Sequence, residues 1–231
     1  MKKTLLNSKK FCLCIDLDDT LYNEIDYVIS GYDSFEKWYH FQYKKIIKYK
    51  LDKNEILKNL KNHVQLFIKK NQINEINSYK IIEFIRNHKP NILINNKNLK
   101  KLETLKLLFK NLVLTTNGRS ITQNNKINCL GIKKYFKKII ISEEIGARKP
   151  QKMFYEILFK EFNNHNFIFI GDNFSIDLEL PSIYGHKVIL IQNKKNRLHE
   201  LEKKTKNIEK INLIYNNFYN INIKDMLKLY S

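Results

Sequence analysis

The stretch FCLCIDLDDTLYNE, residues 11–24, places five apolar residues directly before a group of carboxylates. The apolar run, 11–15, has the length of a buried strand, and Asp16, Asp18 and Asp19 follow where this strand would end. Like charges at this spacing raise one another's pKa, so bringing them together costs free energy. The stretch therefore predicts either a bound cation or a chemical reaction at the end of this strand.

Four further apolar runs have the same form. They are continuous rather than alternating, as expected of strands that are buried on both faces of a parallel sheet. Segments of helical length lie between the later runs, so strands alternate with helices. This pattern predicts an α/β fold with a Rossmann-like, doubly wound parallel sheet. The runs cover residues 112–116, 138–142, 167–171 and 187–191.

A long interval separates the first two apolar runs. About 95 residues lie between them, far more than a crossover between parallel strands needs. Most of this interval has apolar residues at helical spacing, and its aromatic residues fit the core face of a helix better than a stacking platform. We expect residues 22–91 to form an inserted α-helical cap domain, and residues 1–21 and 92–231 to form the α/β core domain.

The C-terminal part of the chain contains two further segments. Residues 192–210 are rich in charge, and we expect a solvated segment that is helical in part. Residues 221–231 have an amphipathic pattern that predicts a last helix packed on the sheet.

The composition excludes several classes of protein. With 231 residues, 43% of them hydrophobic, the chain can build a sizeable core, which argues against global disorder. It contains no run of about 18 apolar residues, so we expect no membrane span. The basic opening MKKTLLNSKK lacks the apolar region of a signal peptide, so we expect a cytoplasmic protein. Three cysteines without a CxxC pair argue against a disulfide framework.

The net charge of +19 raises the possibility of nucleic-acid binding. However, only four of the 42 basic residues are arginines, and the lysines are spread along the whole chain, as an AT-rich coding sequence would favour. Because bidentate recognition of phosphates and bases prefers arginine, nucleic acid is the minor alternative. A positive surface would still attract a phosphorylated substrate. The arginines are Arg86, Arg119, Arg148 and Arg197.

Polar residues follow the other apolar runs as well. Since ligands lie beyond the carboxyl ends of the strands in open α/β sheets, we expect these residues to meet at one edge. They are Asp16 and Asp18 after the first run, Thr116 and Asn117 after the second, Lys149 after the third, and Asp172 and Asp177 after the fourth.

Such a set suits phosphoryl transfer. Mg²⁺ is typically held by one or two carboxylates together with substrate phosphate and water. A carboxylate can attack phosphorus to form an aspartyl-phosphate, and a second carboxylate can protonate the leaving alcohol and later activate water. Threonine and lysine donors would stabilise the charge on the phosphoryl oxygens.

The motifs CIDLDDTLY (14–22), LTTNG (114–118), ARKP (147–150) and GDNFSID (171–177) occur in a fixed order, each at a predicted strand end. In order and spacing they resemble the four motifs of the haloacid dehalogenase-like (HAD) hydrolase superfamily. The position of the predicted helical insertion resembles that of the family's α-helical, type 1 cap.

The resemblance implies a role for each matching residue. Asp16 resembles the nucleophile and a metal ligand, and Asp18 resembles the acid/base, whose backbone carbonyl also reaches the metal. Thr116 resembles the phosphate-binding residue of the second motif. Lys149 resembles the lysine that neutralises nucleophile and phosphate.

The fourth motif and its neighbours complete the expected site. Asp172 resembles an acidic metal ligand, and Asp177 a further ligand or an orienting residue. Asn117 and Arg119 are candidate contacts for phosphate or substrate; alternatively, Asn117 shapes its loop and Arg119 is a surface residue at a helix start. Asp19 stands where the family often has glycine, and we expect it to be a solvated loop acid.

Residues just after the first motif, Tyr22, Asn23 and Glu24, should face the cleft between core and cap. They are candidate specificity contacts, and the alternative is ordinary hinge packing. The substrate and the oligomeric state stay open.

The predicted function is that of a Mg²⁺-dependent phosphatase acting on a small phosphorylated metabolite through an aspartyl-phosphate. Asp18 argues against dehalogenases and phosphonatases, which resemble the motif but lack an acid there. A sugar phosphomutase of the same superfamily is the alternative, because it shares both aspartates. A non-catalytic basic module that binds nucleic acid is the third possibility.

Overall fold

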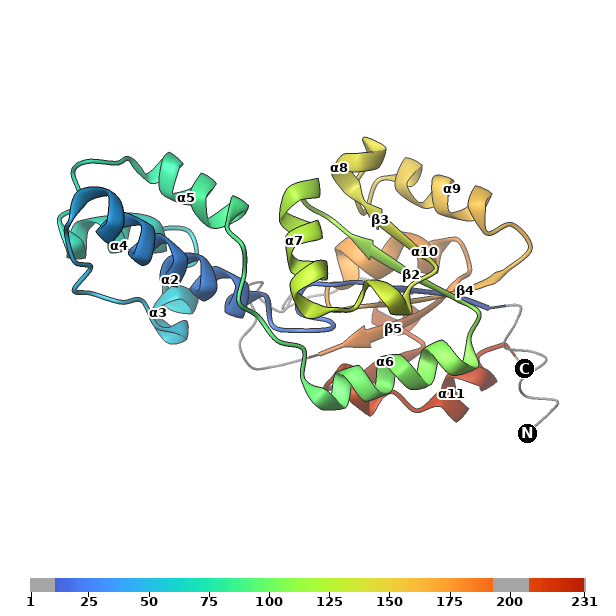
Figure 1. Cartoon of the computed structure of the whole chain (residues 1–231). Helices are drawn as coiled ribbons and strands as arrows, with labels where there is room; N and C mark the ends of the chain where they lie inside the picture. Colours follow the sequence, from blue (N-terminus) through green and yellow to red (C-terminus); the bar gives the residue numbers. More distant parts are fainter. Residues whose placement is uncertain (1–10, 193–207, 231) are drawn as a thin grey trace.

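A computed structural model describes residues 11–192 and 208–230 of the chain (Figure 1). Most of the charge-rich segment for which partial helix was predicted, 192–210, lies outside the described residues. Within them, no helix is long and apolar enough to cross a membrane, and the three cysteines are free thiols.

The described residues contain a six-stranded sheet in the order β3-β2-β1-β4-β5-β6, with every neighbouring pair parallel. The prediction of an α/β fold with a doubly wound parallel sheet is confirmed, and only the short sixth strand was missed. The strands are β1 (Phe11–Ile15), β2 (Asn111–Thr116), β3 (Lys138–Ile141), β4 (Asn166–Gly171), β5 (Lys187–Ile191) and β6 (Leu213–Tyr215).

Helices cover both faces of this sheet (Figure 1). Alternate side chains of β1 enter different cores: Leu13 and Ile15 pack with the helices of one face, and Cys12 and Cys14 with those of the other. Because both faces are buried, the strands read as continuous apolar runs. The first face carries α6 (Asn96–Leu108), α7 (Ser120–Leu130), η1 (Lys133–Tyr135), η4 (Phe218–Asn220) and α11 (Ile223–Lys228), and the second carries α8 (Ser142–Ile145), α9 (Lys152–Glu161), η2 (Phe174–Leu178) and α10 (Glu179–Ile183). The short η3 (Ile208–Lys210) precedes β6.

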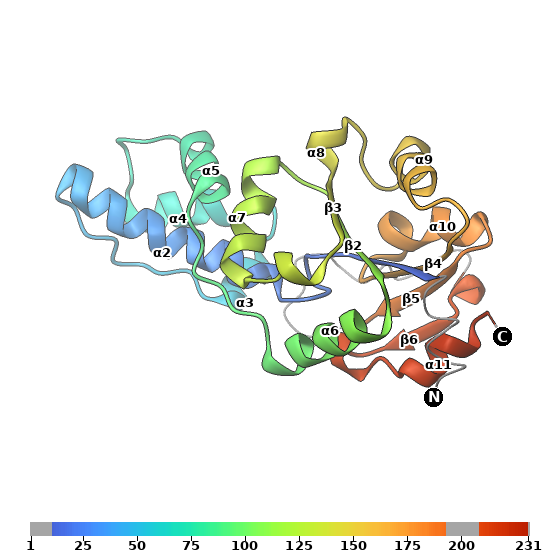
Figure 2. The same cartoon turned by 45° about the vertical axis from the view of Figure 1, so that its right-hand side comes forward.

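The chain between β1 and α6 forms a group of helices with a hydrophobic core of its own (Figures 1 and 2). Phe35 and Phe67 are almost completely buried in this core. Two of the helices approach closely, because a Cβ on Gly31 would lie 2.6 Å from Ile85 Cγ2. The helices are α2 (Glu24–Tyr43), α3 (Lys53–Lys58), α4 (His63–Asn71) and α5 (Ser78–Asn87).

Helix α7 stands between this helical group and the sheet in both views (Figures 1 and 2). It also holds the end of α5, since Thr122 Oγ1 donates to the carbonyl of Arg86 at 2.8 Å. Tyr27 Oη donates to the same carbonyl at 2.9 Å, and Asn125 Nδ2 reaches the carbonyl of His88 at 3.2 Å. The return of the chain from the helical group to the sheet is therefore fixed by hydrogen bonds from both sides.

His88 lies in this junction and is buried. Its Nδ1 lies 2.5 Å from the carbonyl of Ile85, so we assign the proton to Nδ1. Its Nε2 then accepts from Ser30 Oγ at 3.1 Å, and Ser30 Oγ accepts from the backbone N–H of Asn91 at 2.7 Å. Burial lowers the pKa of His88, so the neutral ring is the form that suits this network.

We predict that stability decreases in mild acid and that His88 contributes to this decrease. The unfolded chain takes up the His88 proton near its ordinary pKa of about 6.5, whereas the folded protein does so only at lower pH. The free energy of unfolding should therefore be constant above this pH and fall below it. In His88→Gln the difference in Tm between about pH 7.5 and 5.5 should be smaller than in the wild type.

The exposed His40 provides a control, because His40→Gln changes no buried network. If His88→Gln and His40→Gln show the same difference in Tm as the wild type, the prediction is wrong.

Candidate active site

A pocket of about 120 Å³ lies at the carboxyl ends of β1, β2 and β4. The structure thus brings together residues that are far apart in the chain, as the strand-end pattern predicted. Among the residues that line the pocket are Asp16, Asp18, Thr116, Asn117, Lys149, Asp172 and Asp177.

Lys149 is the central cation of this pocket, and its side chain is 3% exposed. Its Nζ lies 2.6 Å from Asp16 Oδ1, 2.6 Å from Asp177 Oδ1 and 3.0 Å from the carbonyl of Thr115. These three acceptors match the three protons of an ammonium group. Burial alone would lower the pKa of Lys149, but the charges of Asp16 and Asp177 outweigh it and raise the pKa. Lys149 is therefore charged.

Asn117 holds the backbone of Lys149 in place. Its Oδ1 accepts from the N–H of Lys149 at 2.9 Å, and its Nδ2 donates to the carbonyl of the same residue at 2.9 Å. Because both ends of the amide are engaged, the geometry favours the loop-shaping alternative for Asn117 over direct phosphate binding.

Asp16, Asp172 and Asp177 can each offer one carboxylate oxygen, and these oxygens lie within 4.8 Å of one another. All three residues are buried. Burial raises the pKa of Asp16, Lys149 lowers it, and the neighbouring acids Asp177, Asp172 and Asp18 raise it further, so the net pKa lies above its ordinary value. With one lysine among three acids, the group carries excess negative charge on hard oxygen donors, which fits Mg²⁺.

The backbone around Asp177 is shaped for close packing. The π turn η2 carries Asp177 back over Gly171, where an added Cβ would lie 2.7 Å from Asp177 Cβ. Asp177 Oδ2 also accepts from the N–H of Asn173 at 3.1 Å. Residue 171 must therefore be glycine for the third acid to reach the pocket.

The Asp18 carboxylate is not part of this group of acids and has different partners. Oδ1 accepts from Tyr22 Oη at 2.6 Å and from Lys126 Nζ at 2.8 Å, and Oδ2 accepts from Gln123 Nε2 at 2.9 Å. Burial would raise the pKa of Asp18, but the charge and the hydrogen bonds of these partners outweigh it and lower the pKa. The resemblance implies that Asp18 contacts the metal through its backbone carbonyl rather than its carboxylate. This carbonyl contact stays a prediction.

Lys126 and Gln123, both on α7, were missed by the sequence analysis. Lys126 is 2% exposed and pairs with Glu24 at 3.5 Å as well as with Asp18. Gln123 Nε2 also donates to Thr116 Oγ1. Thr122, Gln123 and Lys126 follow the second motif at helical spacing, and polar residues on the inner face of a helix were the signal that could have revealed them.

Two of the other predicted residues lie elsewhere. Arg119 is exposed at the N-cap of α7 and lines a larger neighbouring cleft rather than the phosphate-sized pocket. The expectation that Asp19 is a solvated loop acid was wrong. Asp19 is 4% exposed, its φ is 53°, and its carboxylate accepts from the N–H of Glu24 at the start of α2.

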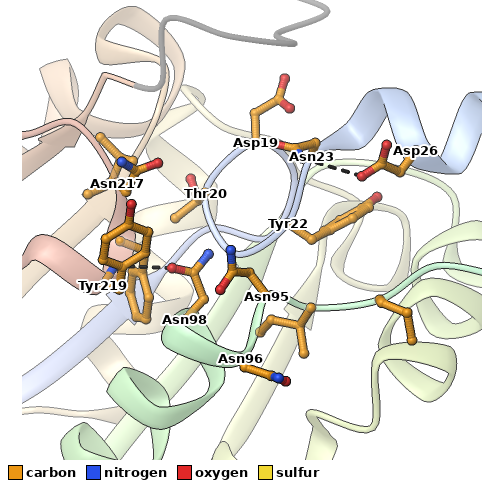
Figure 3. A pocket seen from close by; sticks show the side chains of 14 residues that line it. Asp19, Thr20, Tyr22, Asn23, Asp26, Asn95, Asn96, Asn98, Asn217 and Tyr219 are labelled. Carbon is orange, nitrogen blue, oxygen red and sulfur yellow. Dashed lines mark hydrogen bonds between the residues drawn. The ribbon is translucent and has the colours of Figure 1, made fainter. Parts of the chain in front are cut away.

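The candidate specificity residues Tyr22, Asn23 and Glu24 line different pockets. Glu24 lines both the phosphate-sized pocket and the larger cleft. Tyr22 and Asn23 instead line a separate pocket that also contains Asn95 and Asn98 (Figure 3). Only Glu24 therefore keeps the predicted position facing the cleft, while Tyr22 reaches the site through its bond to Asp18.

We predict that Mg²⁺ raises the Tm of the protein, because it would relieve the repulsion among the three clustered acids. At about a hundred times the Kd the increase should be roughly 5 °C or more. Asp172→Asn should lose most of this increase, and the exposed Asp33→Asn should keep it. Equal increases in the two variants would exclude Asp172 as a ligand.

The profile of the haloacid dehalogenase-like hydrolase family matches residues 13–191, which is more than half of the chain. YfnB of Bacillus subtilis (strain 168), named as a HAD-hydrolase, is 32% identical over 77 residues, which are 32% of this chain and 33% of YfnB. This match therefore spans about a third of the length of the curated relative.

Solved structures resemble nearly the whole chain. Magnesium-bound YfnB from Bacillus subtilis is 17% identical, with 96% of this chain and 99% of that chain covered and a TM-score of 0.62. A protein of Haemophilus somnus 129pt, predicted to be a phosphoglycolate phosphatase, is 18% identical, with 97% and 99% covered and a TM-score of 0.62. A protein of Thermotoga maritima, proposed to be a β-phosphoglucomutase, is 14% identical, with 95% and 97% covered and a TM-score of 0.60.

At these identities the solved structures show a common fold. Together with the profile match and the four motifs at the strand ends, they lead to one conclusion: the chain belongs to the haloacid dehalogenase-like hydrolase family.

Proposed function

We propose that this hydrolase is a Mg²⁺-dependent phosphatase that cleaves a small phosphorylated metabolite through an aspartyl-phosphate on Asp16. The observation that carries the proposal is the buried contact of Lys149 with Asp16 and Asp177 in a pocket of about 120 Å³. This pocket combines a carboxylate nucleophile, a cation and the hydroxyl of Thr116 at one sheet edge, with space of the size of a phosphoryl group.

In the first step the Asp16 carboxylate attacks phosphorus. A bond forms between an Asp16 oxygen and phosphorus, and the bond between phosphorus and the ester oxygen breaks. Lys149 stabilises the charge on the nucleophile and on the phosphoryl oxygens, with Thr116 as a further donor. Asp18, once protonated, gives its proton to the leaving alkoxide.

In the second step water attacks the phosphorus of the aspartyl-phosphate. Asp18 takes a proton from the water, the bond to Asp16 breaks, and inorganic phosphate leaves. The partners of Asp18 on α7 lower its pKa and hold it ionised in the observed arrangement. This arrangement suits the base role of the second step.

The residues that would hold the metal are Asp16, Asp172 and Asp177, with the backbone carbonyl of Asp18 as the predicted fourth contact. When bound, Mg²⁺ would supply positive charge that offsets the carboxylates and the phosphoryl group.

We further propose that residues 22–91 form the cap domain and that the substrate's leaving group lies in the larger cleft between cap and core. Cap-side residues such as Tyr27 and Val64 and core residues such as Thr122 line this cleft, which has a volume of about 890 Å³.

A sugar phosphomutase is the second candidate function, because Asp16 and Asp18 would serve its chemistry equally well. It would return the phosphoryl group from Asp16 to a second hydroxyl instead of to water. A phosphatase releases one inorganic phosphate for each alcohol, whereas a mutase releases none. Measuring both products therefore distinguishes the two functions.

We predict that the wild type hydrolyses a generic aryl phosphate in the presence of Mg²⁺. Asp16→Asn should reduce the rate at least about a thousand-fold, because no carboxylate remains to attack phosphorus. Release of the aryl alcohol measures the rate, with EDTA as the metal control. A folded Asp16→Asn variant as active as the wild type would contradict the proposal.

We predict that Lys126→Met moves the acidic limb of the pH–rate profile to higher pH. Lys126 lowers the pKa of Asp18, so without it Asp18 becomes protonated at higher pH and the base step is lost there. Aryl phosphate turnover between about pH 4.5 and 8 measures the limb. Lys126→Arg retains the charge and serves as the control; a limb that is unchanged in Lys126→Met would contradict the prediction.

A further inference from the structure

The cleft of about 890 Å³ adjoins the phosphate-sized pocket, and Asp18, Glu24 and Asn117 line both. The walls come from α2, α4 and α5 on one side and from α7, the start of α8 and the loop at Arg148 on the other. A phosphate ester in the small pocket would thus direct its leaving alcohol into this cleft.

The cleft gathers the arginines of the part of the chain that the structure describes. Arg86, Arg119 and Arg148 all line it, and they are the only arginines among the described residues. By contrast, only Lys61 and Lys126 line it, in a chain whose basic residues are almost all lysines. In a chain with so many lysines, a cationic cleft without a special requirement would be lined mainly by lysines. The presence of arginines therefore indicates a requirement for the paired, planar N–H donors of the guanidinium group.

The three arginines come from separate elements, and the backbone of each is anchored. The carbonyl of Arg86 accepts from Tyr27 and Thr122, the carbonyl of Arg119 accepts from the N–H of Gln123 at 3.0 Å, and the N–H of Arg148 donates to Gln151 Oε1 at 2.9 Å.

The side chains of these arginines differ from their backbones in having no such partners. Within residues 11–192 and 208–230, none of the three guanidinium groups makes an ion pair or a hydrogen bond, and all three residues are exposed. Their donors are therefore available to a ligand.

The charge of the cleft is opposite to that of the catalytic pocket. Five cationic side chains (three arginines and two lysines) face the two carboxylates Asp18 and Glu24, which leaves a net charge of +3. Lys126 already pairs with both carboxylates. His63 adds no charge at neutral pH, since burial lowers its pKa. The excess positive charge therefore rests on Lys61 and the arginines, and a divalent cation would increase it.

Apolar side chains lie among these cations. Val28, Val64 and Ile85 line the same cleft, with the ring of Tyr27. Such a wall can pack against a short carbon chain, while the arginines require an oxyanion with paired acceptors.

We propose that the leaving alcohol of the substrate carries a second oxyanion, a carboxylate or a phosphate, which Arg86, Arg119 and Arg148 bind in this cleft. The inference rests on the proposed phosphatase function, because that function places the leaving alcohol here. The substrate is then a short phosphate monoester with negative charge at both ends. Arg86 would contact it from the α5 side and the other two arginines from the core, so that the second anion connects the two walls of the cleft.

The test measures binding rather than turnover, using phosphonates that cannot be hydrolysed. Phosphonopropionate carries a carboxylate at its far end, propane bisphosphonate carries a second phosphonate, and the carboxyl methyl ester of phosphonopropionate carries no far charge. In calorimetry with Mg²⁺ at about 0.15 M salt, at least one of the two probes with an anionic far end should bind the wild type about ten-fold or more tightly than the ester. The tighter of the two identifies the second oxyanion as carboxylate or phosphate.

Variants test whether the arginines cause this preference. Arg86→Gln, Arg119→Gln and Arg148→Gln should each reduce the ratio of the ester Kd to the Kd of the preferred probe with an anionic far end by about ten-fold. Lys160→Gln, at an exposed position on α9, removes the same charge outside the cleft and should leave the ratio unchanged. Thermal melting of each variant verifies that it is folded.

Equal binding of the ester and both probes with an anionic far end would overturn the inference, and so would an equal loss of the ratio in Lys160→Gln. The binding test is independent of the test of the proposed phosphatase function. A wild type without aryl phosphatase activity would overturn the phosphatase proposal, whereas the Kd ratio would still decide whether the cleft binds a second oxyanion.

Discussion

The contact of Lys149 with Asp16 and Asp177 is the interaction on which the rest of the site depends. Isolated buried charges cost several kcal/mol each, so carboxylates can gather at this depth only with a cation among them. Lys149 supplies one positive charge to three acids, and the remaining negative charge makes a divalent cation chemically suitable. Much of the surrounding structure serves this contact. Asn117 clamps the lysine backbone, and Gly171 leaves space for Asp177.

Two acids only two residues apart are thereby given different properties. Burial, with the neighbouring carboxylates, raises the pKa of Asp16, whereas the pKa of Asp18 is lowered because the charge and hydrogen bonds of its partners outweigh its burial. Neighbouring groups whose environments shift their pKa values in opposite directions are typical of divided catalytic roles. In this protein the difference in pKa depends on α7, whose inner face carries both the cation and the amide that bind Asp18.

Helix α7 also connects the chemistry to the helical insertion. Its Thr122 and Asn125 bind the chain where it leaves α5, and its Lys126 lies over the ring of Tyr27 on α2 at 4.5 Å. A movement of the helical insertion would therefore shift α7 and, with it, the groups that lower the pKa of Asp18. Arg119 is the N-cap of the same helix, so the proposed second oxyanion would bind beside the residues that lower the pKa of Asp18.

Continuous apolar runs and motifs such as CIDLDDTLY are local signals, so they were sufficient to predict the sheet, the order of the strand-end residues and the family. It did not reveal Lys126 and Gln123, whose contacts with Asp18 join residues more than a hundred positions apart. It also misjudged Asp19, because its buried left-handed position is imposed by packing at the start of α2. The shared cleft of Arg86, Arg119 and Arg148 became visible in the folded chain alone, since no local pattern specifies which separate elements the folded core brings together.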